Sequence, residues 1–178
     1  MRIVGGNNKG RKFEPPKFFK ARPTTDFAKE ALFNLISNKI DLEGKSALDL
    51  FAGTGSISYE FLSRGCSFIR CVDISNKYLM YIKNTANLIS PEKEIIHTTK
   101  SDVFKFLPKH ELNYDIIFAD PPYNLINLED LADLIYENST LKEKSIIIIE
   151  HSKNTNFSTH PRFVDKRSYG SVNFSFFE

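Results

Sequence analysis

The sequence predicts a doubly wound α/β fold, in which helices cover both faces of a mostly parallel sheet. From residue 46 onward, short apolar segments alternate with amphipathic segments of helical length. The apolar segments are nearly continuous, as expected for strands that are buried on both faces of a parallel sheet. The 178 residues suit one domain with a sizeable core, and 41% hydrophobic with 26% charged residues indicate a globular protein rather than a disordered or disulfide-stapled one.

The first regular element is predicted to be a helix capped by Thr25, because Asp26 and Glu30 place negative charge in its first turns and apolar residues recur at helical spacing up to Ile36. The C-terminal segments 162–168 and 172–177 flank Tyr169-Gly170-Ser171, which predicts a hairpin that adds an antiparallel edge to the sheet. The other strands are expected at 46–51, 67–72, 94–98, 114–119 and 145–150, and the other helices at 56–64, 75–89, 102–107 and 128–138.

The net charge of +2 is unevenly distributed along the chain. Residues 1–29 carry eight basic and two acidic side chains, whereas the remaining 149 residues carry 16 basic and 20 acidic ones. Turn residues and prolines resist helix formation in the first 24 residues, so we expect a basic N-terminal extension before a domain at 25–178. Its phenylalanines and basic residues suit base stacking and phosphate contact, although a mobile, solvated terminus is the alternative. The residues expected to bind RNA are Lys9, Arg11, Lys12 and Arg22.

A glycine loop, Ala52-Gly53-Thr54-Gly55, follows the first strand, where nucleotide-like ligands bind in doubly wound folds. It lacks the third glycine of a dinucleotide fingerprint and the lysine of a phosphate-binding P-loop, so it predicts close backbone approach to a ligand without a phosphate. Asp73 lies 20 residues after Gly53, where a carboxylate can accept both hydroxyls of a ribose. A ligand with a ribose, an adenine and an ammonium group but no phosphate is S-adenosylmethionine. A plain tight turn is the alternative.

Two more acidic residues are expected at the same site. Asp49 lies in the first strand and can reach the methionine ammonium group, directly or through water. Asp102 follows the third strand and can accept a hydrogen bond from the adenine amino group. The alternative for this position is that Ser101 or Asp102 only caps the helix that begins there.

The tetrapeptide Asp120-Pro121-Pro122-Tyr123 ends strand 114–119, which we expect beside the first strand. The Asp120 side chain and the Pro121 carbonyl can each accept one N–H of an exocyclic amine, which localises the nitrogen lone pair toward a donor methyl group. The two prolines fix the backbone, and Tyr123 offers a face to an unstacked base. Asp120, Pro121 and Tyr123 are therefore the predicted catalytic residues, and a rigid proline turn with a packed tyrosine is the alternative.

Other chemistry is not indicated. His151 is the one histidine expected near the crevice, and we favour a structural role for it. Cys66 and Cys71 lack CxxC spacing and are expected to be small buried residues, typical of a reducing compartment. The longest apolar run, 146–149, is far too short to span a membrane, and the chain starts without a secretory leader. We expect a cytoplasmic monomer that binds neither a metal nor a membrane.

Six short segments, in order along nearly the whole chain, form a recognisable set. They are Arg2-Ile3-Val4-Gly5-Gly6, Lys9-Gly10-Arg11, Arg22-Pro23-Thr24, Glu30-Ala31-Leu32-Phe33-Asn34, Leu48-Asp49-Leu50-Phe51-Ala52-Gly53-Thr54-Gly55 and Asp120-Pro121-Pro122-Tyr123. Together these motifs resemble the bacterial RsmD-type 16S ribosomal RNA guanine-N2 methyltransferases. The family usually has Thr where this chain has Ala21, Glu where it has Asp73, and more basic residues at 27–29.

The resemblance implies a Rossmann-like methyltransferase fold with seven strands and S-adenosylmethionine as the methyl donor. It further implies methylation of the exocyclic N2 of one guanine in 16S ribosomal RNA, within a small ribosomal subunit or an assembly intermediate. The cofactor-binding residues are then expected to be Asp49, Phe51, Gly53, Gly55, Asp73 and Asp102.

Two other functions remain open at this point. The tetrapeptide also serves adenine-N6 methyltransferases of DNA or RNA, but the chain has no room for a separate DNA target-recognition domain. The other is a non-catalytic RNA-binding assembly factor that keeps the cofactor fold. The intact Asp120 and Tyr123 argue against that second alternative.

Overall fold

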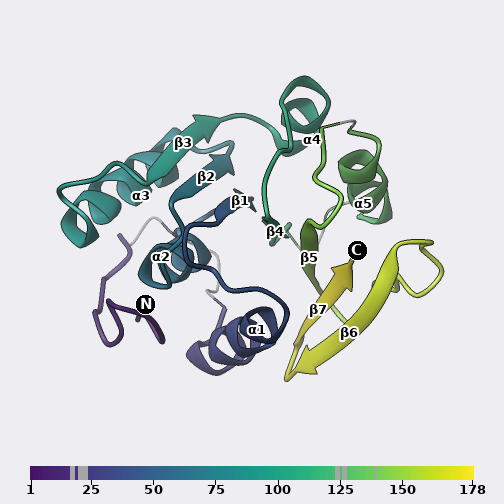
Figure 1. Ribbon diagram of the computed structural model, residues 1–178, viewed down its shortest axis with the longest axis horizontal. Coiled ribbons are helices and arrows are strands. Elements are labelled where there is room, and N and C mark those ends of the chain that lie inside the picture. The colour runs from purple at the N-terminus through teal and green to yellow at the C-terminus, as the bar shows by residue number, and fades with distance from the viewer. Residues whose placement is uncertain (17–18, 20–23, 123–124, 126–127, 139) are drawn as a thin grey trace.

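A computed structural model describes residues 1–16, 19, 24–122, 125, 128–138 and 140–178. These residues contain a seven-stranded sheet with the order β3-β2-β1-β4-β5-β7-β6 (Figure 1). The strands are β1 (Ser46–Leu50), β2 (Phe68–Asp73), β3 (Ile96–Lys100), β4 (Ile116–Ala119), β5 (Ile146–His151), β6 (Phe163–Tyr169) and β7 (Val172–Phe177). Strands β1 to β5 pair in parallel, and β7 pairs antiparallel with both β5 and β6. The predicted doubly wound α/β fold with a C-terminal hairpin is confirmed.

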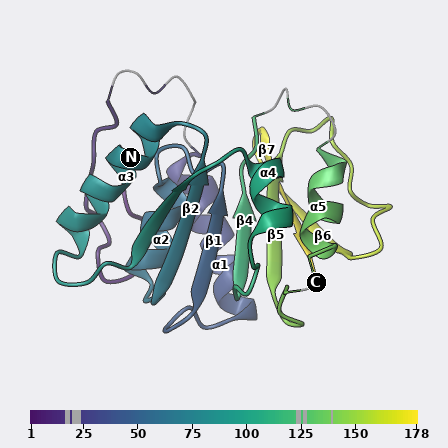
Figure 2. The ribbon, with the colours of Figure 1, turned by 90° about the horizontal axis from the view of Figure 1, so that it is seen from above.

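Helices cover the sheet on both faces, as Figure 2 shows from above. Residues from α1, α2 and α3 pack into one core cluster, and residues from α4 and α5 pack into the other. Every parallel connection therefore places a helix on the sheet, which is why the strands carry apolar side chains on both faces. The helices are α1 (Asp26–Lys39), α2 (Ser56–Ser63), α3 (Asn76–Ile89), α4 (Val103–Phe106), continued by the 3-10 turn η1 (Leu107–Lys109), and α5 (Glu129–Tyr136).

Local signals account for most element boundaries. The Thr25 hydroxyl accepts a hydrogen bond from the Ala28 amide and begins α1, as predicted. The third strand is predicted at 94–98, but β3 begins and ends two residues later. This edge strand is only half-buried, and its polar end, Thr98 to Lys100, pairs with β2. The predicted helix 102–107 is only one turn of α-helix, since Pro108 lies in the 3-10 turn that follows and has no amide hydrogen to donate.

Residues 1–16 form a hairpin that packs on α2. An isolated bridge joins Arg2 to Lys12. The Glu60 carboxylate accepts hydrogen bonds from the amides of Val4 (2.5 Å) and Gly5 (3.3 Å) and forms an ion pair of 3.3 Å with Lys29. The Lys29 and Glu60 side chains are 1% and 0% exposed. The first 16 residues are thus fixed to the helical layer, and one of the basic side chains in the charged segment is buried.

Candidate functional site

A cavity of about 600 Å³ lies at the carboxyl ends of the parallel strands. The sheet order reverses between β1 and β4, and ligands bind at such a reversal in open α/β sheets. The volume falls in the range of small-molecule and cofactor sites. The cavity is lined by Thr24, Asp49, Phe51, Ala52, Gly53, Thr54, Ser56, Ile57, Asp73, Ile74, Tyr78, Ser101, Asp102, Val103, Phe104, Phe118, Asp120, Pro121, Pro122, Leu125 and Glu150.

The glycine loop is held in a left-handed backbone conformation. Gly53 and Gly55 have φ of +52° and +76°, and Phe51, which is not a glycine, has φ of +60°. A Cβ atom on Gly55 would approach Ile82 and Tyr59 to 2.9 Å, so a side chain at this position would displace the packing of α2 on α3. Backbone strain at a non-glycine residue is typical of functional loops. Phe51 and Gly53 line the cavity, whereas Gly55 shapes the loop from behind.

Asp73 ends β2 and anchors two neighbouring loops. Its Oδ2 accepts a hydrogen bond of 2.9 Å from the Gly53 amide, and its Oδ1 accepts one of 2.7 Å from the Ser75 amide. An ionised carboxylate has about four acceptor positions, so each oxygen keeps one for a further donor. The geometry is compatible with two adjacent hydroxyl groups on a bound ribose.

Asp49 lies in the middle of the sheet, one strand from Asp73. It is buried, and its Oδ2 accepts a hydrogen bond from the Ser58 hydroxyl. Burial raises the pKa of Asp49 to about 7, and the neighbouring charges of Asp120 and Asp73 add to the effect. A cation bound in the cavity would stabilise the ionised form of Asp49 and so lower its pKa.

Asp102 performs the structural role that was the alternative interpretation. Its Oδ1 accepts a hydrogen bond of 3.2 Å from the Lys105 amide and caps α4. The residue also lines the cavity, between Ser101 and Val103. Its contact with an adenine amino group stays a prediction.

Asp120 follows β4 and faces the same cavity as the three acids already described. Its amide donates a hydrogen bond of 3.3 Å to the Leu50 carbonyl, which ties the start of the proline turn to β1. Burial raises the pKa of Asp120 to about 7. Pro121 lines the cavity beside it, as predicted. Tyr123, the third predicted catalytic residue, lies outside the described residues.

Glu150 also lines this cavity, and sequence reasoning did not single it out. It lies near the end of β5 and is 2% exposed, and its Oε2 accepts a hydrogen bond of 3.1 Å from the Thr24 hydroxyl. Burial and the charge of Asp120 raise the pKa of Glu150 to about 8. The available signal was positional, because Glu150 ends an apolar strand as Asp73 and Asp120 do.

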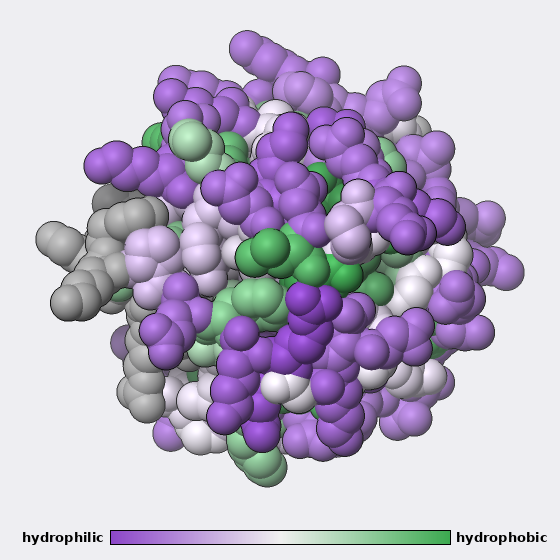
Figure 3. All heavy atoms as spheres, turned by 90° about the vertical axis from the view of Figure 1, so that its left-hand side faces the viewer, coloured by the Kyte–Doolittle hydropathy of each residue, from purple (hydrophilic) through white to green (hydrophobic). Residues whose placement is uncertain are grey.

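The basic residues expected to bind RNA have different surroundings. Lys9 and Lys12 are exposed on the hairpin. Arg11 donates hydrogen bonds to the Leu88 carbonyl (2.8 Å) and the Ile89 carbonyl (3.5 Å), so its guanidinium caps the C-terminal end of α3. Arg22 lies outside the described residues. The side of the molecule that carries this hairpin and α3 is mostly hydrophilic, with a small hydrophobic area near its centre (Figure 3).

His151, Cys66 and Cys71 do not line the first cavity. His151 is buried, and its ring nitrogens lie 2.8 Å from the Ser152 carbonyl and from the Ser175 hydroxyl. Cys66 and Cys71 are buried free thiols. The described His, Cys, Asp and Glu side chains form no group of three or more that could hold a metal ion. The described helices are too short or too polar to cross a membrane.

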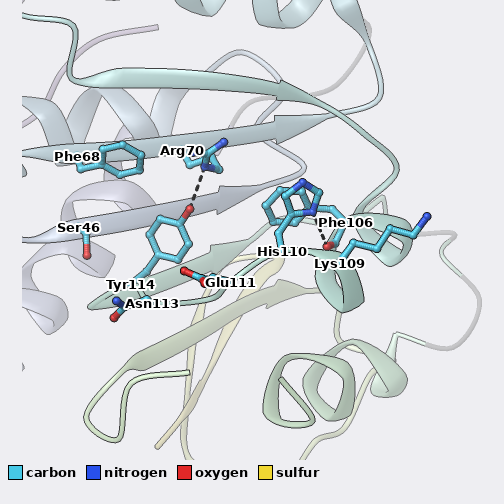
Figure 4. A pocket seen from close by; sticks show the side chains of 9 residues that line it. All are labelled: Ser46, Phe68, Arg70, Phe106, Lys109, His110, Glu111, Asn113 and Tyr114. Atoms are coloured by element: carbon cyan, nitrogen blue, oxygen red, sulfur yellow. Dashed lines mark hydrogen bonds between the residues drawn. The ribbon is translucent and has the colours of Figure 1, made fainter. Parts of the chain in front are cut away.

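A second cavity, of about 510 Å³, lies near the amino ends of β1 and β2 (Figure 4). Arg70 points across it and donates a hydrogen bond of 2.9 Å to the Tyr114 hydroxyl and another of 2.9 Å to Thr99. His110 stacks on Phe106 at its far side. None of the residues predicted to bind the cofactor or RNA lines this second cavity.

The whole chain, residues 1–178, matches the model of the family described as Conserved hypothetical protein 95. It is 31% identical over 156 residues to Ribosomal RNA small subunit methyltransferase D of Buchnera aphidicola subsp. Baizongia pistaciae, with 88% of this chain and 78% of that protein covered. The protein of the same name from Escherichia coli K12 is 31% identical over 162 residues, with 90% and 79% covered. The solved structure of yhhF from Escherichia coli has a TM-score of 0.84 at 28% identity, covering 99% of this chain and 96% of that chain.

Proposed function

Because the chain belongs to the RsmD-type family of 16S ribosomal RNA methyltransferases, we propose that it methylates the exocyclic N2 of a guanine in 16S ribosomal RNA, with S-adenosylmethionine as the donor. One observation carries the proposal. Asp49, Asp73 and Asp120 line one cavity at the reversal of the sheet, with the glycine loop on one side and the Asp120-Pro121-Pro122 turn on the other. The cavity thus joins a site for a cationic nucleoside to a site for an amine.

The residues present fit S-adenosylmethionine. Asp73 keeps one acceptor position on each oxygen for the ribose hydroxyls, beside the Gly53 backbone. Asp49 is a buried acid that accepts hydrogen bonds from the hydroxyl and the backbone amide of Ser58, both neutral donors, so an ammonium group would stabilise its ionised form. Ile74, Val103 and Phe104 give the cavity an apolar wall suited to an adenine ring. When bound, the cofactor supplies a methyl group on a sulfonium.

Asp120 and Pro121 orient the accepting amine. The Asp120 carboxylate and the Pro121 carbonyl each accept one N–H of the exocyclic amine, which turns the nitrogen lone pair away from the base ring. The nitrogen must lose one proton when it becomes methylated. With its pKa raised to about 7, Asp120 is a suitable acceptor for that proton at neutral pH. Tyr123 is proposed to stack on the extruded base.

The proposed substrate is the RNA within a small ribosomal subunit or an assembly intermediate. Lys9 and Lys12 are exposed on a hairpin that is fixed to the domain, so they can contact phosphates without the ordering of a flexible tail. Arg22 is proposed to join them. Because Arg11 holds the end of α3, its contribution to RNA binding is expected to be smaller.

The test uses cofactor with a labelled methyl group, together with small subunits and with naked 16S RNA from a strain that lacks this protein. The RNA is digested to nucleosides, and the labelled nucleoside is identified and its position mapped. N2-methylguanosine is the expected product, and it should be absent with Asp120→Ala. Labelled N6-methyladenosine would overturn the proposed base. No labelling of either substrate by the wild-type protein would favour the non-catalytic assembly factor.

A further inference from the structure

Glu150 occupies the position next to Asp120 across the sheet. Strands β4 and β5 are parallel, and Ala119 pairs with Ile149, so Asp120 and Glu150 are the next residues along neighbouring strands. Paired residues of parallel strands lie about 5 Å apart and point to the same face. Phe118 and Ile148, two positions earlier, belong to the core cluster under α1 to α3. Both acids therefore face that side of the sheet, with Glu150 on the side of Asp120 away from β1 and the cofactor residues.

The Glu150 carboxyl group has few partners for a group that is 2% exposed. Among the described residues, only the Thr24 hydroxyl donates a hydrogen bond to it. No lysine, arginine or histidine is found among the described residues that line the cavity. A buried acid without a cation or several donors is costly, and here a second acid lies beside it. The pair of acids therefore needs N–H donors that the described chain does not supply.

A guanine base supplies such donors in one plane. Its exocyclic N2 carries two hydrogens, and the adjacent ring nitrogen N1 carries a third. The Asp120 carboxylate and the Pro121 carbonyl are assigned to the two N2 hydrogens. The N1–H group is then left to point toward the neighbouring strand β5, which carries Glu150. Adenine places an unprotonated ring nitrogen beside its amine. An ionised carboxylate cannot form a hydrogen bond with that nitrogen, because both groups are acceptors.

We propose that Glu150 selects guanine as the methylated base, by accepting a hydrogen bond from N1–H while Asp120 and Pro121 hold the N2 amine. This inference rests on the proposed guanine-N2 activity and adds the residue that sets base specificity. Thr24 positions the Glu150 carboxyl group from the segment that precedes α1. A site that hydrogen-bonds a substrate N–H disfavours an analogue that lacks it, because the buried acceptor is then left without a donor.

The experiment compares guanine with 2-aminopurine at the methylated position of 16S RNA in reconstituted small subunits. 2-Aminopurine keeps the exocyclic amine, but its N1 carries no hydrogen. The kcat/KM for each base is measured at pH 8.5, above the pKa of about 8 of Glu150, so that its carboxyl group is ionised and can only accept a hydrogen bond. The proteins compared are the wild type, Glu150→Gln and the control Glu143→Gln, which makes the same chemical change at an exposed site. The wild type and the control should prefer guanine by about 10- to 100-fold. Glu150→Gln should bring the two bases to within about threefold, since an amide can donate to N1 or accept from it.

The outcomes separate this inference from the proposed function. If the wild type methylates guanine N2 but Glu150→Gln lowers kcat/KM equally for both bases, Glu150 has only a structural role and the specificity assignment is overturned. If the wild type does not methylate guanine N2 at all, the proposed function fails first. Cofactor affinity of Glu150→Gln, measured by calorimetry, should equal that of the wild type, because Glu150 lies away from the cofactor residues. A large loss of that affinity would also contradict the assignment.

Discussion

The amide of Gly53 donates a hydrogen bond of 2.9 Å to Oδ2 of Asp73, and so joins the glycine loop after β1 to the end of β2. The same carboxylate holds the Ser75 amide at the start of α3. One side chain thus positions the loop and presents the acceptors for a ribose. Cofactor binding and loop geometry are therefore expected to respond together when Asp73 is changed.

We expect Asp73→Ala to weaken cofactor binding by about 1–3 kcal/mol, the usual cost of removing a buried hydrogen-bond partner. Isothermal titration calorimetry with S-adenosylmethionine measures the change. Thr25→Ala is the comparison, because Thr25 caps α1 and does not line the cavity; its loss should lower the free energy of unfolding by the roughly 1 kcal/mol typical of a cap and leave the cofactor affinity unchanged. An unchanged affinity in Asp73→Ala would refute its ribose role.

Asp120→Ala is expected to abolish methyl transfer while leaving cofactor affinity nearly unchanged. The variant removes the acceptor for one N2 hydrogen and the group that takes up the released proton, but it leaves Asp49, Asp73 and the glycine loop in place. Single-turnover methylation and calorimetry on the same preparation separate the two effects. Turnover at the wild-type rate would remove Asp120 from the catalytic assignment.

Changes in the hairpin should separate RNA contact from structure. Replacing Lys9 and Lys12 together by alanine should lower the slope of log K against log salt by up to about two, since each phosphate contact contributes nearly one unit. Arg11→Ala should instead lower the melting temperature, because the guanidinium caps α3. Lys144→Ala and Lys153→Ala, at exposed sites far along the chain, serve as controls. An unaltered slope in the double variant would exclude the hairpin from RNA binding.

Raised acid pKa values should make the unliganded protein less stable as the pH rises. Burial and the charge of Asp120 raise the pKa of Glu150 to about 8 in the folded state, from about 4.5 in the unfolded chain. Between these values the folded state binds more protons, so the free energy of unfolding falls with pH. Asp49 and Asp120 act in the same direction up to about pH 7.

Urea unfolding of wild type and Glu150→Gln from pH 4.5 to 8.5 measures this effect. The variant lacks one titrating group, so its stability curve should be flatter by up to about 1.4 kcal/mol per pH unit within the window. Groups that do not interact with Glu150 cancel in the difference, whereas Asp120, whose charge raises the pKa of Glu150, also loses a neighbouring charge in the variant. Parallel curves for the two proteins would show that the pKa of Glu150 is not raised.

Local patterns in the sequence were enough to predict much of the fold and those residues of the candidate site that belong to motifs. The parallel strands follow from continuous apolar runs, and the glycine loop and the Asp120 turn follow from motifs placed at strand ends. Glu150 had only its place near the end of an apolar strand as a signal, because its hydrogen bond with Thr24 joins residues 126 positions apart in the chain. The hydrogen bond from Arg11 to the Leu88 carbonyl at the end of α3 likewise joins distant segments of the chain. Such contacts exist only after the layers have packed.

The attachment of the hairpin to Glu60 has a consequence for the order of folding during synthesis. The hairpin is synthesised before α2, so its amides at Val4 and Gly5 find their acceptor only when residue 60 has emerged from the ribosome. Until then the apolar side chains of Ile3 and Val4 are exposed to water and to other nascent chains. Closing this contact requires a loop of more than fifty residues, so it is expected late in folding, after local helix formation. The attachment of residues 1–16 to the domain therefore depends on the prior packing of α2 on the sheet.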